Sequence, residues 1–234
     1  MTVAIVVPAR NEAEVLPATL AELFRDPALP LEVVVVDGGS TDDTRELALA
    51  LGARVLEAPA GRAWQMNAGA RATRGDPIVF LHADTRLGAE HIRAMLGALA
   101  DPGVAFGSFP IRIDRRGAFY RFTEWSANHR TRLDAAPYGD QAIFCRRRVF
   151  EAAGGYPEVE ILEDVLLARR LRDEGRYVFL PGPPVRTSAR RWEREGKLRT
   201  TWRNASTRVL FELGVEPARL RRWYDAWAKS PVRP

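Results

Sequence analysis

A run of four valines followed by an acidic turn with two glycines narrows the possible folds of this chain more than any other feature. The valines occupy positions 33–36, and the turn 37–42 begins with Asp37 and Gly38 and continues through Ser40. Four consecutive β-branched residues are typical of a central strand in a parallel sheet that is covered on both faces. Ligands of open α/β sheets bind at the carboxyl ends of such strands. We therefore expect Asp37, with Gly38 and Ser40 beside it, to hold the base or ribose of a nucleotide.

The same turn is also compatible with a purely structural role. Thr41 or Asp42 would be a good N-cap for the helix that follows, and Asp and Ser are ordinary turn residues. Taken alone, the turn does not decide between a nucleotide site and a capped loop.

A second buried strand is expected at residues 3–7. It ends at Pro8, which would stop the strand ladder because proline has no N–H to donate, and Arg10, Asn11 and Glu12 follow in a turn. Two strand ends would then meet at one crevice, which favours the nucleotide interpretation. The sequence has neither a G-x-G-x-x-G after the first strand nor a P-loop, so a nucleotide would be held by other means.

Apolar runs and helical stretches alternate along the chain. Strands are expected near 3–7, 32–36, 53–57, 77–81, 104–113, 141–145, 176–180 and 185–189, and helices near 13–24, 42–51, 62–73, 89–100 and 162–174. Only the polar, aromatic stretch 114–137 breaks the rhythm. This alternation predicts an α/β fold with a mostly parallel central sheet and helices on both faces.

Composition is ordinary for a globular chain, with 46% hydrophobic and 28% charged residues in 234. No apolar run approaches the roughly 20 residues that a membrane span needs, and the amino terminus lacks the pattern of a secretory leader. The single Cys145 cannot form an internal disulfide, and it is expected to be a buried structural thiol. A cytoplasmic location is the resulting expectation, since thiols stay reduced there.

The basic charge belongs to the carboxyl-terminal tail. Residues 186–234 carry 13 Lys or Arg and 5 Asp or Glu, a balance of +8, whereas the whole chain carries +5. Four of the six tryptophans also lie between Trp192 and Trp227. Pro217 fits the first turn of a last helix, in which Leu220, Trp223 and Trp227 would share one face. This helix is expected to pack on the domain, with contact to the inner face of a membrane as the alternative and nucleic-acid binding not expected.

Six short segments occur in an order and spacing that is specific as a set. They are residues 7–12, 37–42, 61–69, 82–84, 163–164 and 188–192. On these segments the chain resembles the family 2 glycosyltransferases, which are inverting enzymes of the GT-A (Rossmann-like) fold and use nucleotide-diphosphate sugars. The resemblance covers most of residues 1–192, and its details are similar to a bacterial subgroup of small members associated with radical-SAM and selenium-domain proteins. We expect one domain over 1–234, with a nucleotide-sugar half (1–113), an acceptor half (114–192) and a basic aromatic helical tail (193–234).

A metal site is expected where the strand 77–81 ends. His82 and Asp84 would lie on the same side of an extended chain. The resemblance matches Asp84 to the last Asp of the family's D-x-D motif, which implies that it binds Mn²⁺ or Mg²⁺, and carboxylate and phosphate oxygens suit these ions. His82 departs from the motif and is expected to contact the sugar or diphosphate. The alternative for Asp84 is a helix N-cap.

Glu163 and Asp164 are the candidates for catalysis. An acceptor hydroxyl needs a general base, since its proton must leave as the new bond forms. The two residues head a helix in which Asp164 would align with the apolar positions, while Glu163 points about 100° away. The resemblance assigns the base to Asp164 and leaves Glu163 in support. Without the resemblance, the favoured interpretation is that both acids complement the helix dipole.

Further substrate contacts are expected from three segments. Arg62 and Asn67 lie in a helix whose amino end suits anionic groups. Residues 188–192 resemble the family's Q-x-x-R-W motif with Ser188 in place of Gln, and Arg190, Arg191 and Trp192 are the candidate contacts there. The missing Gln argues against processive synthesis. The remaining acceptor candidates are Asp140 and Gln141.

The sequence thus predicts a metal-dependent, inverting enzyme that moves one sugar from a nucleotide-diphosphate sugar to an acceptor hydroxyl or phosphate, which could be lipid-linked. Two alternatives remain open at this point. One is a sugar-phosphate nucleotidyltransferase, although the glycine-rich phosphate loop of that class is missing. The other is a non-catalytic module that binds nucleotide sugars or docks on a membrane.

Overall fold

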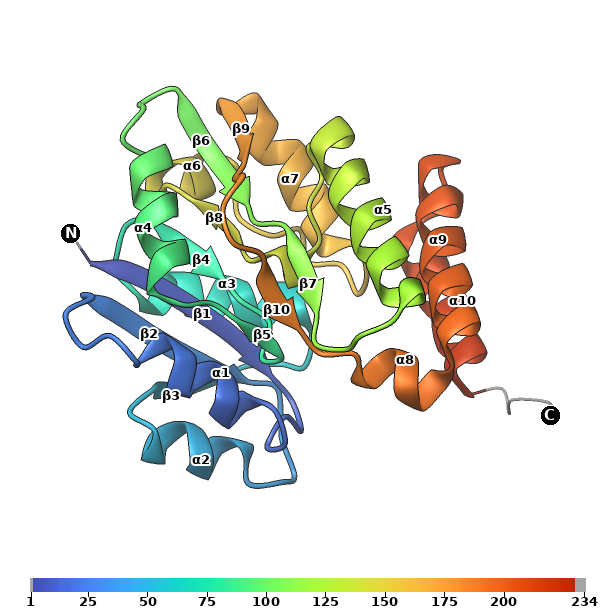
Figure 1. The fold of residues 1–234 in the computed structure, drawn as a ribbon, viewed down its shortest axis with the longest axis horizontal. Coiled ribbons are helices and arrows are strands. Elements are labelled where there is room, and N and C mark those ends of the chain that lie inside the picture. The colour runs from blue at the N-terminus through green and yellow to red at the C-terminus, as the bar shows by residue number, and fades with distance from the viewer. Residues whose placement is uncertain (1, 230–234) are drawn as a thin grey trace.

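The structure is a computed structural model that describes residues 2–229. A seven-stranded sheet forms its centre (Figure 1). Its strands are β1 (Val3–Ala9), β2 (Leu31–Asp37), β3 (Arg54–Glu57), β4 (Ile78–Phe80), β6 (Val104–Ser108), β8 (Ile143–Cys145) and β9 (Arg176–Phe179), in the order β3-β2-β1-β4-β8-β6-β9. Only β8 runs antiparallel to its neighbours. The predicted α/β class with a mostly parallel sheet is confirmed.

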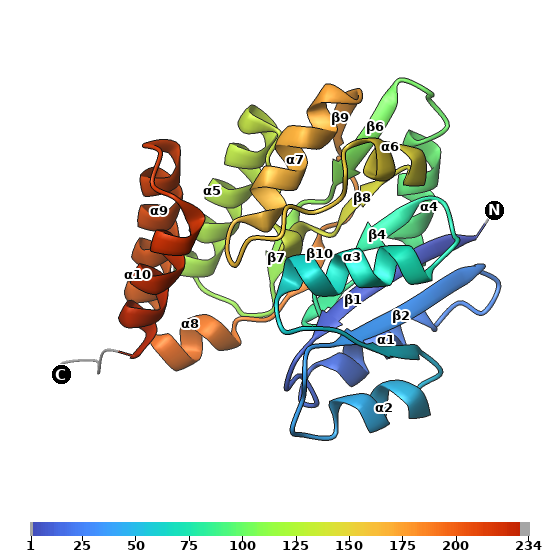
Figure 2. The same ribbon diagram turned by 180° about the vertical axis from the view of Figure 1, so that it is seen from behind.

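Helices cover both faces of this sheet (Figures 1 and 2). One face carries α1 (Leu16–Leu23), α2 (Thr44–Ala50) and α4 (Ala89–Ala98), and the other carries α3 (Arg62–Ala72), α6 (Arg147–Ala152) and α7 (Glu163–Asp173). The valines of β2 alternate between the two layers: Val33 and Val35 pack with the first, Val34 and Val36 with the second. Burial on both sides explains why β2 reads as a continuous apolar run.

The apolar stretch 104–113, expected as one strand, is two strands in two sheets. It breaks after Ser108, and residues Ile111–Ile113 form β7 in a second sheet with β5 (Thr85–Arg86) and β10 (Val185–Thr187), in the order β5-β10-β7. Pro110 lies at the break, and proline cannot continue a ladder. The second sheet places the segment after Asp84 next to the segment before Arg190.

Pro8 does not end β1, contrary to the expectation. The strand continues to Ala9, and Pro8 remains in register with Val36 of β2. On its other edge, pairing with β4 stops at Val6. Proline is tolerated here because the ladder to β4 has already ended.

The stretch 114–137 is not irregular, since it contains the 17-residue helix α5 (Ala118–Asp134). The tail forms α8 (Arg190–Glu195), α9 (Lys197–Glu212) and α10 (Pro217–Lys229). Pro217 begins the last helix as predicted. This helix packs on α9, where the Trp227 ring lies 4.9 Å from that of Trp202 and Arg203 donates a 2.9 Å hydrogen bond to Tyr224.

The thiol and the lengths of the helices bear on two further expectations. Cys145 is a free, buried thiol, as expected, and burial raises the pKa of that thiol. Within residues 2–229, none of the helices combines the length and apolar character that crossing a bilayer requires.

Candidate active site

The loops after β1 and β2 are joined side by side by hydrogen bonds. The backbone N–H of Asn11 donates to Ser40 Oγ at 2.9 Å, and Asn11 Oδ1 accepts from the N–H of Thr41 at 2.8 Å. The N–H of Glu12 donates to Thr44 Oγ1 at 2.8 Å. Asn11 adopts a positive φ of 55°, a conformation that Asn tolerates better than most residues. The two turns singled out in the sequence therefore form one surface at the carboxyl edge of the sheet.

Asp37 lies fully buried beneath this surface. Its Oδ2 accepts from the N–H groups of Gly39 and Ser40 at 3.1 and 3.0 Å, and the Ser40 hydroxyl donates to Oδ1. The side chain of Gln65, to which the sequence reasoning gave no role, donates to the carbonyls of Ala9 and Val36 at 2.9 and 2.7 Å. In this structure Asp37 and Gln65 fix the shape of the two strand ends.

Helix α3 separates the two residues that were expected to act together. Arg62 lies at its exposed first turn, 3.9 Å from Glu163 Oε1. Asn67 is buried, and its side chain pairs with the backbone of Tyr156 through two hydrogen bonds of 2.9 Å. Arg62 thus lies beside Glu163 at the start of α7, whereas Asn67 ties α3 to the loop before α7.

Arg190, near the carboxyl-terminal end, contacts two acidic residues of the amino-terminal half. Its guanidinium forms an ion pair with Glu12 and lies 4.0 Å from Asp84 Oδ2. Asp84 itself follows β4. Burial raises the pKa of Glu12 even though Arg190 opposes the shift, and the charge of Asp84 adds to the increase. Residues from the two ends of the chain therefore share one electrostatic cluster.

The two residues after Arg190 lie differently. Arg191 is exposed, and its charge reaches His82, whose pKa is lowered by burial first and by Arg62 and Arg191 second. Trp192 packs in a small apolar cluster with Ile113 and donates to Thr201 Oγ1 at 3.2 Å. Trp192 therefore joins α8 to β7 and to α9.

His82, Gly139 and Asp164 form a continuous contact between the two halves of the chain. The N–H of Gly139 donates to Asp164 Oδ2 at 2.8 Å. A Cβ atom at Gly139 would lie 2.1 Å from His82 Nε2, so only glycine permits this approach. His82 Nε2, Asp140 Oδ1 and Asp164 Oδ1 are buried and have no hydrogen-bond partner among the described residues. Buried polar atoms normally find partners, which makes this group a candidate for ligand contact.

The pKa values of three carboxyl groups near this contact are raised, which favours their protonated forms. Burial, followed by the charge of Glu163, raises the pKa of Asp164 well above its ordinary range. Burial also raises the pKa of Glu163, which Arg62 opposes. Burial, followed by the charge of Asp84, raises the pKa of Asp140 to about 6. Strongly shifted groups in a crevice are typical of functional sites.

Tyr156 was missed by the sequence reasoning. Its ring packs edge-on against Phe80 at 4.9 Å, its hydroxyl is buried without a described partner, and burial with the charges of Asp164 and Glu163 raises its pKa. No local pattern marks it, since it follows two glycines in a loop. Gln141, expected at the acceptor, instead accepts from Thr131 Oγ1 at 2.7 Å inside the fold.

The residues 2–229 contain no group of three or more His, Cys, Asp or Glu side chains that could hold a metal ion. Asp84 is the carboxylate that lies at the strand end, with Asp140 close enough to feel its charge. Mg²⁺ commonly takes only one or two carboxylates from the protein and the rest of its ligands from phosphates and water. The residues present fit an ion that is bound together with a diphosphate.

The family model of glycosyl transferase family 2 matches residues 4–150. The chain therefore belongs to glycosyltransferase family 2. A PGL/p-HBAD biosynthesis glycosyltransferase of Mycobacterium bovis is 30% identical over 167 residues, 65% of this chain and 62% of that protein. A 4,4'-diaponeurosporenoate glycosyltransferase of Staphylococcus haemolyticus is 32% identical over 98 residues, 38% of this chain and 26% of that protein. The chain thus spans less than two thirds of either relative.

Solved structures with the same fold include S. aureus TarS in complex with UDP-GlcNAc, with a TM-score of 0.61 and 16% identity over 80% of this chain and 58% of that one. Glucosyl-3-phosphoglycerate synthase from Mycobacterium tuberculosis, in complex with Mn²⁺, uridine diphosphate and phosphoglyceric acid, gives a TM-score of 0.56 and 22% identity over 74% and 64%. These likenesses establish the GT-A fold.

Proposed function

We propose that this chain transfers one sugar from a nucleotide-diphosphate sugar to an acceptor hydroxyl or phosphate, with inversion and with the aid of Mn²⁺ or Mg²⁺. The observation that carries the proposal is a linked set of charges: Arg190 pairs with Glu12 and lies 4.0 Å from Asp84 Oδ2, and the charges of Glu163, Asp164 and Asp84 together raise the pKa of Arg62. The structural relatives solved with UDP-GlcNAc, or with uridine diphosphate and Mn²⁺, support a donor of this class.

The donor would lie on the surface formed by the loops after β1 and β2. Asp37 and Ser40 shape this surface, with Pro8 and Gly38 beneath it, and Arg10, an exposed residue of the first loop, is available for the nucleotide. Arg62, Arg190 and Arg191 supply positive charge toward the diphosphate. Residues 1–113 would thus carry the donor and residues 114–192 the acceptor.

Asp84 would hold the divalent ion, with the Arg190 guanidinium 4.0 Å from its Oδ2. The ion, when bound, supplies Lewis-acid stabilisation for the negative charge that develops on the leaving nucleotide diphosphate. Arg190 is held by Glu12, so its guanidinium is positioned next to the same charge before any ligand arrives. His82 would contact the sugar or the diphosphate as a neutral imidazole, because its pKa is lowered by burial and by Arg62 and Arg191.

Asp164 would act as the general base. Its Oδ2 is fixed by the N–H of Gly139, which leaves Oδ1 free to accept the acceptor proton. As the acceptor oxygen attacks the anomeric carbon, its proton passes to Oδ1 and the bond to the diphosphate breaks with inversion. The raised pKa of Asp164 makes it a stronger base than an ordinary carboxylate. Glu163 would keep Arg62 in place.

The test is a thermal-shift screen of UDP-, GDP-, dTDP- and CDP-sugars with Mn²⁺, Mg²⁺ or EDTA. A ligand that binds only the folded state adds about 2.7 kcal/mol at 100 times its dissociation constant, so a donor should give a clear shift that EDTA removes. Asp84→Ala should lose this shift. Asp164→Asn should keep it while transfer is lost. A wild-type protein without any shift would contradict the donor site.

A second proposal concerns contact of the carboxyl-terminal tail with a membrane. We infer that the tail brings a lipid-linked acceptor within reach through peripheral membrane contact, because apolar side chains on α9 and at its end are exposed beside many basic residues. The exposed apolar residues are Leu198, Trp202 and Val209 on α9 and Leu213 at its C-cap. Co-sedimentation with anionic vesicles should fall for Leu198→Ser/Trp202→Ser, and unchanged binding would contradict it. The relation to the radical-SAM-associated subgroup and a cytoplasmic location stay predictions.

A further inference from the structure

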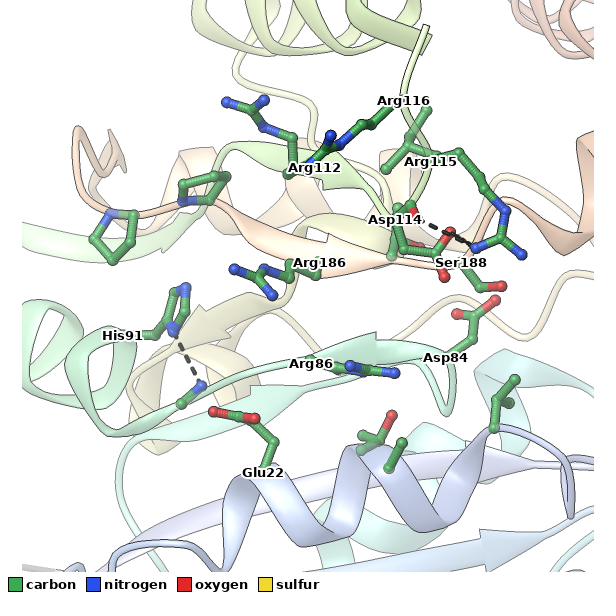
Figure 3. A pocket seen from close by; sticks show the side chains of 18 of the residues that line it. Glu22, Asp84, Arg86, His91, Arg112, Asp114, Arg115, Arg116, Arg186 and Ser188 are labelled. Atoms are coloured by element: carbon green, nitrogen blue, oxygen red, sulfur yellow. Dashed lines mark hydrogen bonds and ion pairs between the residues drawn. The ribbon is translucent and has the colours of Figure 1, made fainter.

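A cavity of about 1100 Å³ opens between α1 and the small sheet, away from Asp164. Asp84 and Ser188 lie at one end of it and His91 at the other (Figure 3). The proposed transfer uses only the Asp84 end. The remainder of this cavity has no assigned role.

Three arginines form a row across the small sheet. Arg86 on β5 is paired in register with Arg186 on β10, and Arg186 is paired with Arg112 on β7. Residues at matching positions on adjacent strands point to the same face. All three side chains are exposed, while the residues on either side of each are buried. Figure 3 shows Arg86 and Arg186 reaching into the middle of the cavity.

This row, Arg86, Arg186 and Arg112, is not neutralised by the chain. Within residues 2–229, Arg86 and Arg186 have neither an ion pair nor a side-chain hydrogen bond, and Arg112 has one distant contact, 3.8 Å from Glu124. Two carboxylates that line the cavity pair with arginines outside the row, and a third, Glu90, lies 3.4 Å from His91 Nδ1. Glu22 pairs with Arg25 at 2.7 Å, and Glu14 pairs with Arg194 at 2.8 Å.

Such an arrangement works against folding. Like charges directly opposite each other on neighbouring strands are destabilising, and arginine is not discharged at any ordinary pH. Strands lie about 4.8 Å apart, so three guanidinium groups present donors over roughly 10 Å. Arginine matches phosphate and carboxylate oxygens with paired hydrogen bonds. An anion with more than one such group would remove the repulsion and use this geometry.

We propose that the row binds a small soluble molecule carrying two or more phosphate or carboxylate groups, at a site separate from the donor and from Asp164. The cavity is a half-open hollow and not a flat face, which favours a small molecule over a lipid surface. The site goes beyond the transfer reaction, and its occupation does not depend on the roles proposed for Asp84 or Asp164. It would let such a molecule bind next to the segment that carries Asp84.

The test uses pyrophosphate as the probe, titrated calorimetrically at low ionic strength with EDTA present. The variant Arg86→Gln/Arg186→Gln should bind pyrophosphate at least about tenfold more weakly than wild type, because two charge-assisted contacts are lost. The matched control is Arg71→Gln, an exposed arginine of α3 on the opposite face of the central sheet, and it should bind like wild type. Any pyrophosphate held at the donor crevice contributes equally to all three proteins.

Melting temperatures show whether weaker binding by the double variant reflects loss of the arginines or loss of folded protein. Without pyrophosphate, the double variant should melt at the same temperature as wild type or higher, since like-charge repulsion has been relieved. A lower melting temperature would overturn the proposal, because the arginines would then serve the fold. Equal binding by wild type and double variant, no binding by wild type, or row-dependent binding only to anionic vesicles would each overturn it as well.

Discussion

Polar groups in the loops that follow β1 and β2 are hydrogen-bonded, whereas several buried polar groups around Asp164 are not. In the loops, Asp37, Ser40 and Asn11 are all engaged in hydrogen bonds with one another or with nearby backbone. Around Asp164, the polar atoms His82 Nε2, Asp140 Oδ1, Tyr156 Oη and Asp164 Oδ1 are buried without a described partner. We name these four residues the unpaired cluster.

This difference indicates that the loops and the unpaired cluster have different roles. A loop whose polar groups are already satisfied offers a rigid, pre-formed surface, and binding to it costs little reorganisation. A buried group without a partner is expensive to maintain. Proteins keep such groups where a ligand or a reaction needs them. The loops therefore suit recognition of a constant part of the substrate, and the unpaired cluster suits chemistry.

The largest effect should come from Asp164→Asn. If Asp164 is the base, the rate of transfer should fall by about 10²–10⁴-fold, because general-base catalysis contributes that much, while donor binding by thermal shift stays. The matched control is Asp173→Asn in the last turn of the same helix, where the side chain is exposed, and it should retain full activity. A fully active Asp164→Asn enzyme would remove the chemical role of the unpaired cluster.

The second-largest effect is expected for Arg190→Gln. This substitution removes the nearest cation from the half-buried carboxylates of Glu12 and Asp84, which should lower the free energy of unfolding by about 1–3 kcal/mol and weaken donor binding. Chemical denaturation measures the first effect and the thermal-shift screen the second. Arg194→Gln breaks an exposed pair with Glu14, in which the side chains are 66% and 67% exposed, and should cost about 0.5 kcal/mol or less. Equal losses in the two variants would contradict a special role for Arg190.

Gly139→Ala should damage the junction between the two regions. Its new Cβ would lie 2.1 Å from His82 Nε2, so His82 or the strand end must move, at a cost of about 1–3 kcal/mol for overpacking. Activity should fall as well, since the Gly139 N–H orients Asp164. As a control, Gly97→Ala on α4 meets no atom within 4 Å and should stabilise the protein by up to about 1 kcal/mol. Denaturant unfolding and a transfer assay report both effects, and an unperturbed Gly139→Ala enzyme would contradict the contact.

The smallest effect concerns pH. The base works only when ionised, and because its pKa is raised, transfer should increase with pH through a range above that of an ordinary carboxyl. The charge of Asp140 adds to this shift, after burial and Glu163. Asp140→Asn should therefore move the acid limb of the kcat/KM profile to lower pH. A limb that stays in place, or moves to higher pH, would contradict the coupling of Asp140 to Asp164.

Local patterns predicted the amino half better than the rest. Strands β1, β2 and β4 follow from buried apolar runs, because a parallel strand covered on both faces must be apolar along its whole length. Helix α5 was missed because its aromatic residues do not mark a buried face: Phe122 and Trp125 are 65% and 60% exposed. The break at Pro110 was missed because the apolar character continues on both sides while the chain changes sheets.

The sequence by itself determined the family, the parallel sheet and the positions of Asp84 and Asp164 at the ends of their segments, since these depend on short motifs and on burial patterns of neighbouring residues. Only the tertiary structure decided which side chains meet. Arg190 reaches Glu12 across 178 positions, Gly139 fits between His82 and Asp164, and Arg86, Arg186 and Arg112 line up through strand register. Each of these contacts joins segments remote in sequence, and their distances are set by how the two sheets and the helices pack.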